Sequence, residues 1–181
     1  MASSITDELA KLHTLMGAEF SRQVELIAKR SEFHPLEGEI DIFIAGSEQH
    51  DDFDNLLNAA RKAVEHGYKV FVLPNPQGVR TADFIFERKG VYRMYDLKTI
   101  IGKSSVSNRL IESIGQTNHV LLNMTTQYNT GLLAAQIKSY FELSPTALEV
   151  LIFKGKQVFS IKRKYALQKW FVIKFKKEYG K

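Results

Sequence analysis

Residues 82–110 read ADFIFERKGVYRMYDLKTIIGKSSVSNRL, and the interpretation of the whole chain starts from them. The first part predicts a β-hairpin, because two strand-like runs flank the turn ERKG. The second strand leads through GKSSVSN into a helix expected from about Ser105 to Ile114. Charged and small polar residues therefore gather where a strand ends and a helix begins.

The segments around this stretch alternate between helical and strand-like patterns. The expected elements are a helix over 5–30, a strand over 40–45, a helix over 53–65, a strand over 68–74, the hairpin, the helix after it, a strand over 119–124, a helix over 130–143, a hairpin around KGK at 154–156, and a basic helical tail. This order predicts an α+β fold with a central, mainly antiparallel sheet and flanking helices. We expect residues 1–35 to form an N-terminal helical segment that precedes an α+β domain of residues 36–181.

The net charge of +5 is unevenly distributed along the chain. Residues 1–80 hold 8 Lys and Arg against 13 Asp and Glu, whereas residues 81–181 hold 17 against 7. A basic half favours a polyanionic partner, with nucleic acid first among the candidates. A solvated, lysine-rich surface is the alternative explanation.

Composition excludes several other kinds of site. The chain has no cysteine, which excludes disulfides, thiolate catalysis and cysteine-ligated zinc. No run approaches the roughly 20 apolar residues of a membrane span, so we expect no transmembrane segment. The first residues carry acids and lack a continuous apolar stretch, which does not fit a secretory signal.

Acidic and basic residues on the hairpin form the first candidate site. Asp83 lies near the start of the first strand, and Asp96 and Lys98 lie two residues apart on the second, where they share a face. Two carboxylates can hold a divalent cation, and a lysine beside them can steady a phosphate. This is the spacing of PD-(D/E)xK nucleases, with Ala82 where that motif often has proline. Alternatively, Asp96 and Lys98 are the polar face of an edge strand.

The helix start after this strand is the second candidate site. Backbone N–H groups at a helix N-terminus, together with Lys103 and serine hydroxyls, can bind a phosphate. The commoner role of Ser104 or Ser105 is an ordinary N-cap. The glycine spacing of a Walker loop is absent, so ATP is not expected.

In the order of their motifs, these segments resemble the C-terminal tRNase domains of contact-dependent inhibition toxins, within the barnase–EndoU–colicin–RelE-like (BECR) nucleases, although the loop between Ser104 and the helix is about two residues shorter than in those relatives. The resemblance covers roughly residues 55–163 and includes the upstream strand GYKVFVLPNPQG and the terminal hairpin EVLIFKGKQVFSIKR. The positions that match the family pattern are Asp83, Asp96, Lys98, Thr99, Gly102, Lys103, Ser104, Ser105, Asn108, Leu110, Gln116 and Asn118.

The resemblance implies a BECR-like nuclease core over residues 36–181 and a toxin-like endoribonuclease that cleaves RNA, with tRNA as the expected substrate. It implies catalytic roles for Asp83, Asp96, Lys98 and Ser105. The residues it implies for substrate binding are Thr99, Lys103, Ser104, Asn108 and Gln116. It also implies an immunity or inhibitor protein as partner, and action in the cytoplasm or after delivery into the cytoplasm of a target cell.

The sequence leaves the cofactor and two other functions open. If a metal takes part, Mg²⁺ is the candidate and Asp83 and Asp96 are its ligands; some BECR members work without metal. The first alternative function is a metal-dependent PD-(D/E)xK-type DNA nuclease, and the second is a non-catalytic nucleic-acid-binding protein of a mobile element.

Three further features have two interpretations each. His119 could act as a general base, although a partly buried structural histidine is the commoner case. Asn123 could support the substrate or cap the following turn. The aromatic residues of the basic tail after Lys162 suit RNA stacking, but their helical spacing equally fits a core face. A helix on a membrane surface is a weaker, third interpretation of this tail.

Overall fold

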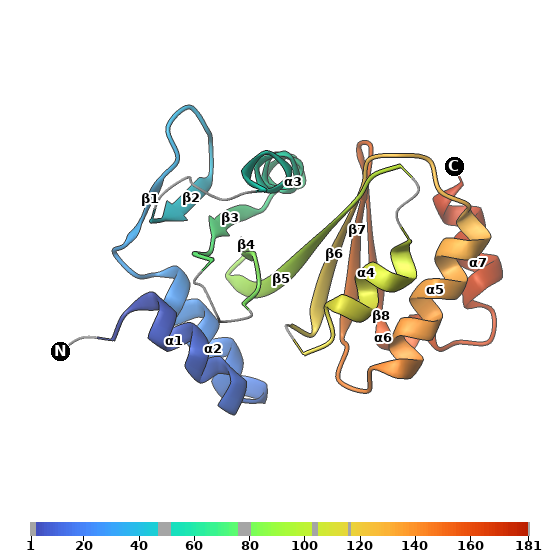
Figure 1. Ribbon diagram of the computed structural model, residues 1–181, viewed down its shortest axis with the longest axis horizontal. Helices are drawn as coiled ribbons and strands as arrows, with labels where there is room; N and C mark the ends of the chain where they lie inside the picture. The colour runs from blue at the N-terminus through green and yellow to red at the C-terminus, as the bar shows by residue number, and fades with distance from the viewer. Residues whose placement is uncertain (1–2, 47–51, 76–80, 103–104, 116, 181) are drawn as a thin grey trace. The chain divides into compact units, whose positions relative to one another are not determined.

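The computed structural model describes residues 3–46, 52–75, 81–102, 105–115 and 117–180. The chain divides into two compact units, Met1–Asp96 (unit 1) and Leu97–Lys181 (unit 2). The division falls inside strand β5 (Val91–Ile100), so each unit contains part of this strand (Figure 1). The boundary predicted near residue 35 therefore does not coincide with the division into compact units.

Unit 1 consists of helices packed on a small sheet. Its elements are α1 (Ile5–Lys11), η1 (Leu12–Thr14), α2 (Gly17–Ala28), β1 (Phe33–Pro35), β2 (Ile42–Ala45), α3 (Phe53–Glu65), β3 (Lys69–Val72), β4 (Phe84–Arg88) and the first part of β5. The strands pair in sequence order, antiparallel except for β2 with β3, which are parallel.

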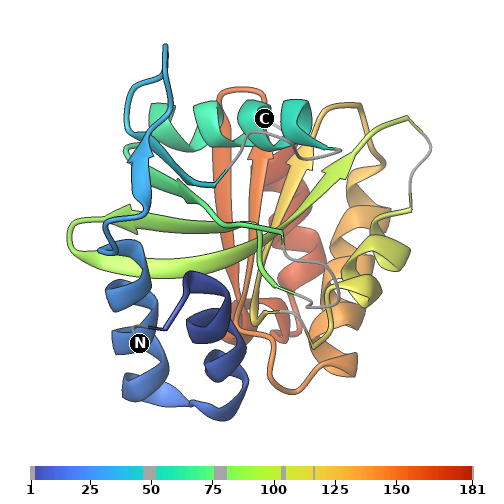
Figure 2. The ribbon, with the colours of Figure 1, turned by 60° about the vertical axis from the view of Figure 1, so that its left-hand side comes forward.

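Strand alternation gives this sheet two buried faces. One face packs against α1 and α2 through a core that includes Leu9, Ile27, Ile85 and Met94. Helix α3 packs on β2 and β3, and it lies on the other side of the sheet in both ribbon views (Figures 1 and 2). Its buried side is made mostly of alanines, which let the helix approach the strands closely.

Two sequence predictions for unit 1 need correction. The helix expected over residues 5–30 is two helices and a 3-10 turn, because Leu15 and Met16 are extended and Gly17 has a φ of +60°. The strand β1 was not expected in a segment with a proline, and it is defined only by its antiparallel pairing with β2.

Unit 2 continues β5 and adds three strands and four helices. Its elements are α4 (Val106–Glu112), β6 (His119–Met124), α5 (Thr130–Leu143), β7 (Glu149–Lys154), β8 (Gln157–Lys162), α6 (Arg163–Ala166) and α7 (Phe171–Tyr179). Strands β6 and β7 are parallel, and β7 and β8 form an antiparallel hairpin. All four helices contribute to one core, which covers one face of these strands.

The α+β fold class is confirmed. The described strand pairs are mostly antiparallel, and helices cover the strands in both units. The helices expected over 53–65 and 130–143 and the strand expected over 119–124 have the predicted bounds. Both predicted hairpins are present, with two-residue turns.

Candidate functional site

Strand β5 buries polar residues in an otherwise apolar run. From Met94 to Ile100 every residue is buried, which indicates that both faces of the strand are covered. Within this run Asp96 is 3% exposed, and Lys98 and Thr99 are each 8% exposed. These residues are therefore not the solvated polar face of an edge strand, so that alternative interpretation is wrong. Burying such groups costs free energy unless they are paired, which makes this segment of β5 the first place to look for function.

Asp83 and Asp96 lie on neighbouring chain segments of unit 1. The Asp83 N–H donates to the carbonyl of Tyr95 at 3.0 Å, and the Asp83 carbonyl accepts from the Leu73 N–H at 2.9 Å. Asp83 is thus held between the end of β3 and the strand that carries Asp96. The hairpin therefore places the backbone of Asp83 beside the strand segment that carries Asp96.

A metal site with more ligands is not found in the described part of the chain. No group of three or more His, Asp or Glu side chains that could hold a metal ion occurs among the described residues. Two carboxylates, Asp83 and Asp96, remain the predicted ligand set. Carboxylate oxygens fit Mg²⁺, which is commonly bound through one or two carboxylates together with water and phosphate.

Thr99 has a buried hydroxyl that lacks a hydrogen-bond partner in the described part of the chain. Its Oγ1 is inaccessible to solvent and bonds to none of the residues that the structure describes. Leaving such a group unpaired costs about 1–3 kcal/mol. Because side chains alternate along a strand, Asp96 and Lys98 share one side of β5 and Thr99 lies on the other.

The start of α4 is more fully capped than predicted. Ser105 is the N-cap, and its Oγ accepts from the Asn108 N–H at 3.4 Å. The Val106 N–H donates to the Tyr128 hydroxyl at 3.3 Å, and this hydroxyl donates to Gln136 Oε1 at 2.8 Å. The expected row of free N–H groups for a phosphate is therefore partly occupied, and Ser105 has the ordinary capping role. The side chain of Asn108 is exposed on α4.

Residues that follow β6 form hydrogen bonds with the segment at the end of β5, a link that was not among the sequence predictions. The Thr125 N–H and Oγ1 donate to the Ile100 carbonyl at 3.2 and 2.7 Å. The Thr126 Oγ1 donates to the Gly102 carbonyl at 3.4 Å. The only signal in the sequence is the polar run TTQYN directly after a buried strand. Three predicted substrate-binding residues, Lys103, Ser104 and Gln116, lie outside the described residues.

His119 belongs to a closed polar network in unit 2. Its Nδ1 lies 3.0 Å from Glu149 Oε1, on the parallel neighbour strand. The other oxygen of this buried carboxylate accepts from Ser160 Oγ and lies 3.3 Å from Lys162 Nζ. A carboxylate bonded to Nδ1 is the arrangement that orients an imidazole for acid–base chemistry. The Glu149 carboxylate also contacts Ser160 and Lys162, so the network equally fits a structural histidine. Asn123 is fully buried on β6 rather than at a solvated turn.

The aromatic residues of the basic tail fall into two groups. Phe171, Phe175 and Tyr179 are buried in the core of unit 2, as the helical spacing allowed, whereas Trp170 is 64% exposed. Burial raises the pKa of Tyr179 to about 12, because the charged phenolate is disfavoured away from water.

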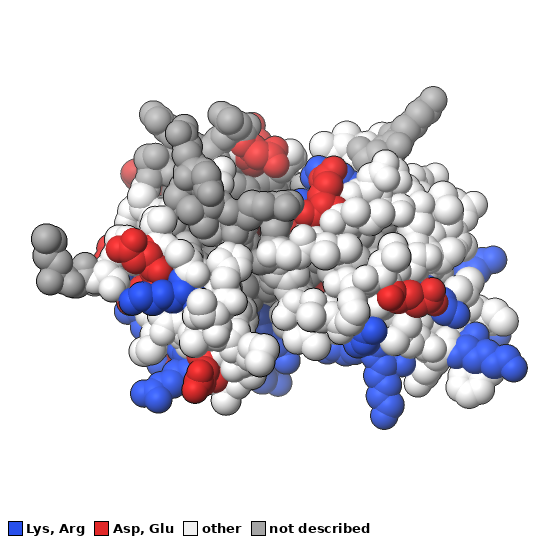
Figure 3. Space-filling view, turned by 60° about the horizontal axis from the view of Figure 1, so that its bottom comes forward, with Lys and Arg blue, Asp and Glu red and all other residues white. Residues whose placement is uncertain are grey.

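The lysines of the basic tail are exposed to solvent rather than buried in the core of unit 2. The exposed ones are Lys162, Lys164, Lys169, Lys174, Lys176 and Lys177. Basic side chains, drawn in blue, project from the molecular surface in Figure 3. In the described ranges, no helix is long and apolar enough to cross a membrane.

Comparison with known proteins does not identify a family. No family model and no curated protein matches the chain. One solved structure is similar: a chain of the CdiA-CT/CdiI toxin and immunity complex from Burkholderia pseudomallei, with a TM-score of 0.46 and 18% sequence identity. The match covers 66% of the present chain and 98% of the other.

Proposed function

We propose that this chain is a toxin-like endoribonuclease that cleaves RNA, with tRNA as its substrate. The observation that carries the proposal is the run of buried polar residues on β5, in which Asp96, Lys98 and Thr99 replace apolar side chains inside a covered strand. Sequences break the apolar pattern of a buried strand at functional sites more than elsewhere. The spacing of Asp83, Asp96 and Lys98 adds the chemistry that phosphodiester cleavage requires.

Each of these residues has a role in the proposed reaction. The 2′-hydroxyl of the ribose attacks phosphorus, the bond to the 5′-oxygen breaks, and a proton passes from the attacking to the leaving oxygen. Asp96, supported by Asp83, orients the nucleophile and accepts its proton. Lys98 neutralises the charge that develops on the phosphate. Thr99 lies on the opposite side of β5 from Asp96 and Lys98, so its assignment to substrate binding rests on the family pattern alone. If Mg²⁺ takes part, Asp83 and Asp96 hold it.

Other predicted site residues support these roles. As N-cap, Ser105 fixes the start of α4 and with it the exposed side chain of Asn108. We propose that Lys103, Ser104 and Gln116 bind substrate, as the family pattern implies. The exposed lysines of the tail fit binding of the RNA backbone, since each phosphate contact adds electrostatic affinity. A toxin of this kind also has an immunity protein as partner and acts in the cytoplasm of a target cell.

The test is cleavage of total tRNA and of duplex DNA by the purified chain, with Mg²⁺ and with EDTA. Asp96→Asn and Lys98→Met should each lower the rate of tRNA cleavage by about 100-fold or more. Matched controls are Asp54→Asn and Lys29→Met, which make the same changes on exposed helix surfaces. Thermal unfolding of all five proteins separates loss of activity from loss of fold.

The outcomes distinguish the candidate functions. Cleavage of tRNA that both site variants retain would contradict the proposed site. Cleavage of DNA alone would favour the PD-(D/E)xK-type nuclease. Binding of RNA without cleavage in every protein would favour the non-catalytic nucleic-acid-binding protein. The EDTA reaction decides whether a metal is needed.

A further inference from the structure

Unit 1 contains a pocket that none of the roles above uses. It has a volume of about 200 Å³ and lies on the β4–β5 hairpin, with Tyr68 contributed from the segment before β3. Its lining includes three aromatic residues, Tyr68, Phe86 and Tyr95, and three basic ones. Among the described residues that line the pocket, none is acidic. Pockets for drug-sized ligands span roughly 300–1,000 Å³, so this one has room for a single small group.

The aromatic side of the pocket is rigid. Phe86 and Tyr95 are each 1% exposed, and their ring centroids lie 5.0 Å apart. Tyr68 lies 5.3 Å from Phe86 and remains partly exposed. The guanidinium of Arg88 is 4.4 Å from the Tyr68 centroid, and it also donates to the His66 carbonyl at 3.3 Å. Aromatic rings and guanidinium planes of this kind are surfaces on which unpaired bases stack.

The turn of the hairpin holds a cation in an unfavourable backbone conformation. Lys89 and Gly90 form the two-residue turn, with φ values of +52° and +79°, as in a type I′ turn. Asn is favoured over lysine at the first position, and a lysine with positive φ costs about 1 kcal/mol. The Glu87 carboxylate accepts from the Gly90 N–H at 2.9 Å, so this nearby acid is engaged in the turn. A lysine at this position is therefore better explained by its charge than by the turn.

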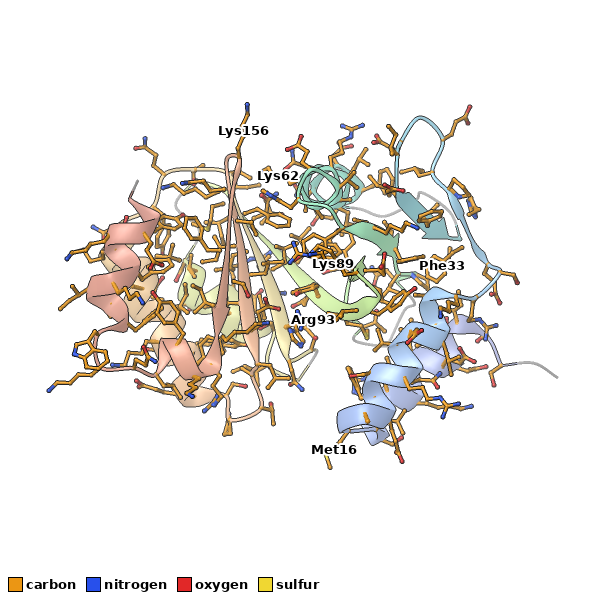
Figure 4. All side chains as sticks on the ribbon, turned by 180° about the vertical axis from the view of Figure 1, so that it is seen from behind. Met16, Phe33, Lys62, Lys89, Arg93 and Lys156 are labelled. Carbon is orange, nitrogen blue, oxygen red and sulfur yellow. The ribbon has the colours of Figure 1, made fainter. Side chains whose placement is uncertain are left out.

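Arg93 supplies the third charge. It pairs with Phe86 in the register of β4 and β5, which places it beside the aromatic side of the pocket. Lys89 and Arg93 are both exposed, and both belong to the hairpin shown from behind in Figure 4. Two exposed cations beside a stacking surface are complementary to a nucleotide, which joins a planar base to a phosphate.

We propose that this pocket binds one nucleotide of a single-stranded RNA, with the base against Tyr68 and Arg88 and the phosphate between Lys89 and Arg93. The inference that the nucleotide belongs to an RNA strand rests on the function proposed above. The pocket then sets which part of the RNA is held, separately from the residues of β5 that act on it.

The test is binding of a fluorescein-labelled 2′-O-methyl oligoribonucleotide of mixed sequence, followed by fluorescence anisotropy at several salt concentrations. Arg93→Ala and Lys89→Asn should each weaken binding about five- to ten-fold. Each should also lower the slope of log Kd against log salt by about 0.7, since one phosphate contact is lost. Lys89→Asn should melt no lower than wild type, because Asn suits the turn.

The second hairpin offers a matched control. Lys156 is exposed in the two-residue turn between β7 and β8, at the tip of that hairpin (Figure 4). Lys156→Asn removes the same charge by the same substitution, and it should leave affinity and salt slope as in wild type. Equal effects of Lys89→Asn and Lys156→Asn would overturn the proposal, because they would show a general effect of charge.

Competition experiments test the contribution of the base. Nucleoside 5′-monophosphates should displace the labelled RNA at lower concentrations than inorganic phosphate does, and Tyr68→Leu should remove most of this difference. Equal displacement by both would overturn the stacking role of Tyr68. Unlabelled RNA of the same sequence is the reference competitor. If a nucleoside 5′-monophosphate displaces the label at a far lower concentration than this RNA does, the ligand is a free nucleotide, and the RNA assignment is overturned.

This experiment separates the pocket from the proposed reaction. The 2′-O-methyl group blocks attack by the 2′-hydroxyl, so binding is measured whether or not the chain is a nuclease. Binding that depends on the pocket, without cleavage of any RNA, would support the pocket and contradict the ribonuclease. If cleavage depends on Asp96 while the pocket variants bind RNA like wild type, the ribonuclease proposal is supported and the pocket proposal is contradicted.

Discussion

Strand β7 buries the carboxylate of Glu149 and strand β5 buries the hydroxyl of Thr99, and these two polar groups differ in their hydrogen bonds. On β7 the carboxylate of Glu149 has partners on both oxygens, from His119, Ser160 and Lys162. On β5 the hydroxyl of Thr99 has none among the described residues. A buried polar group with all its partners can be part of the scaffold, whereas one without a partner costs stability that a bound ligand can recover. The comparison teaches that a buried polar group can belong to the scaffold, and that for Thr99 the missing partner, in addition to burial, is the feature that points to a ligand.

The largest expected effect is the loss of stability when the β7 network is broken. Glu149→Ala removes the carboxylate that holds His119, Ser160 and Lys162. We expect the free energy of unfolding to fall by about 3 kcal/mol. Chemical denaturation measures this, with Glu142→Ala on the exposed surface of α5 as the control.

A substitution of His119 tests whether the Glu149 network is part of the scaffold or part of a catalytic site. If the network is scaffold, His119→Gln lowers stability and leaves the cleavage rate per folded molecule unchanged. Loss of cleavage at unchanged stability would show instead that Glu149 orients a catalytic imidazole.

An intermediate effect is expected from the buried hydroxyl of Tyr179, which is 3% exposed. Its pKa is raised to about 12 in the folded protein, against an ordinary value near 10. A raised folded pKa contributes stability that is complete below pH 10 and is lost as the pH rises towards 12, by up to about 2 kcal/mol. Between pH 9 and pH 12, the free energy of unfolding should fall less steeply with rising pH in Tyr179→Phe than in the wild type. Identical pH profiles would show that burial of this hydroxyl does not affect its titration.

The smallest expected effect is a gain in stability rather than a loss. Thr99→Val replaces the unpartnered hydroxyl by a methyl group of the same shape, so the free energy of unfolding should rise by about 1 kcal/mol. Cleavage of tRNA, or affinity for it, should fall about ten-fold if the hydroxyl serves the substrate. A variant that loses stability would show that Thr99 has a partner in the scaffold, and the contrast with Glu149 would disappear.

The strong local patterns allowed much of the fold to be predicted. The alternation and the turn residues of the hairpins, and the apolar spacing of the helix over 53–65, were sufficient for their bounds. Strand β1 could not be predicted, because three residues with a proline carry no pattern and exist as a strand only through pairing with β2. The helix break at Gly17 was not predicted, because the apolar spacing of α1 continues in α2 and suggests a single helix.

The candidate site was predictable to the extent that it lies on one hairpin. The register of the strands brings Asp83 beside the segment that carries Asp96, and strand alternation places Lys98 on the same side as Asp96. The link from Tyr128 to the start of α4 joins residues 22 apart in sequence, and no local pattern reports it.

The sequence by itself determined most of the helices and strands, the hairpin that carries the two acidic residues, and the basic second half of the chain. These follow from short-range periodicity, turn chemistry and composition, which act within a few residues. Only the tertiary structure decided which polar groups are buried and which of them are satisfied, and that the β4–β5 hairpin and Tyr68 form a basic, aromatic pocket. Burial and partner choice depend on chain segments distant in sequence, so they exist only once the chain has packed.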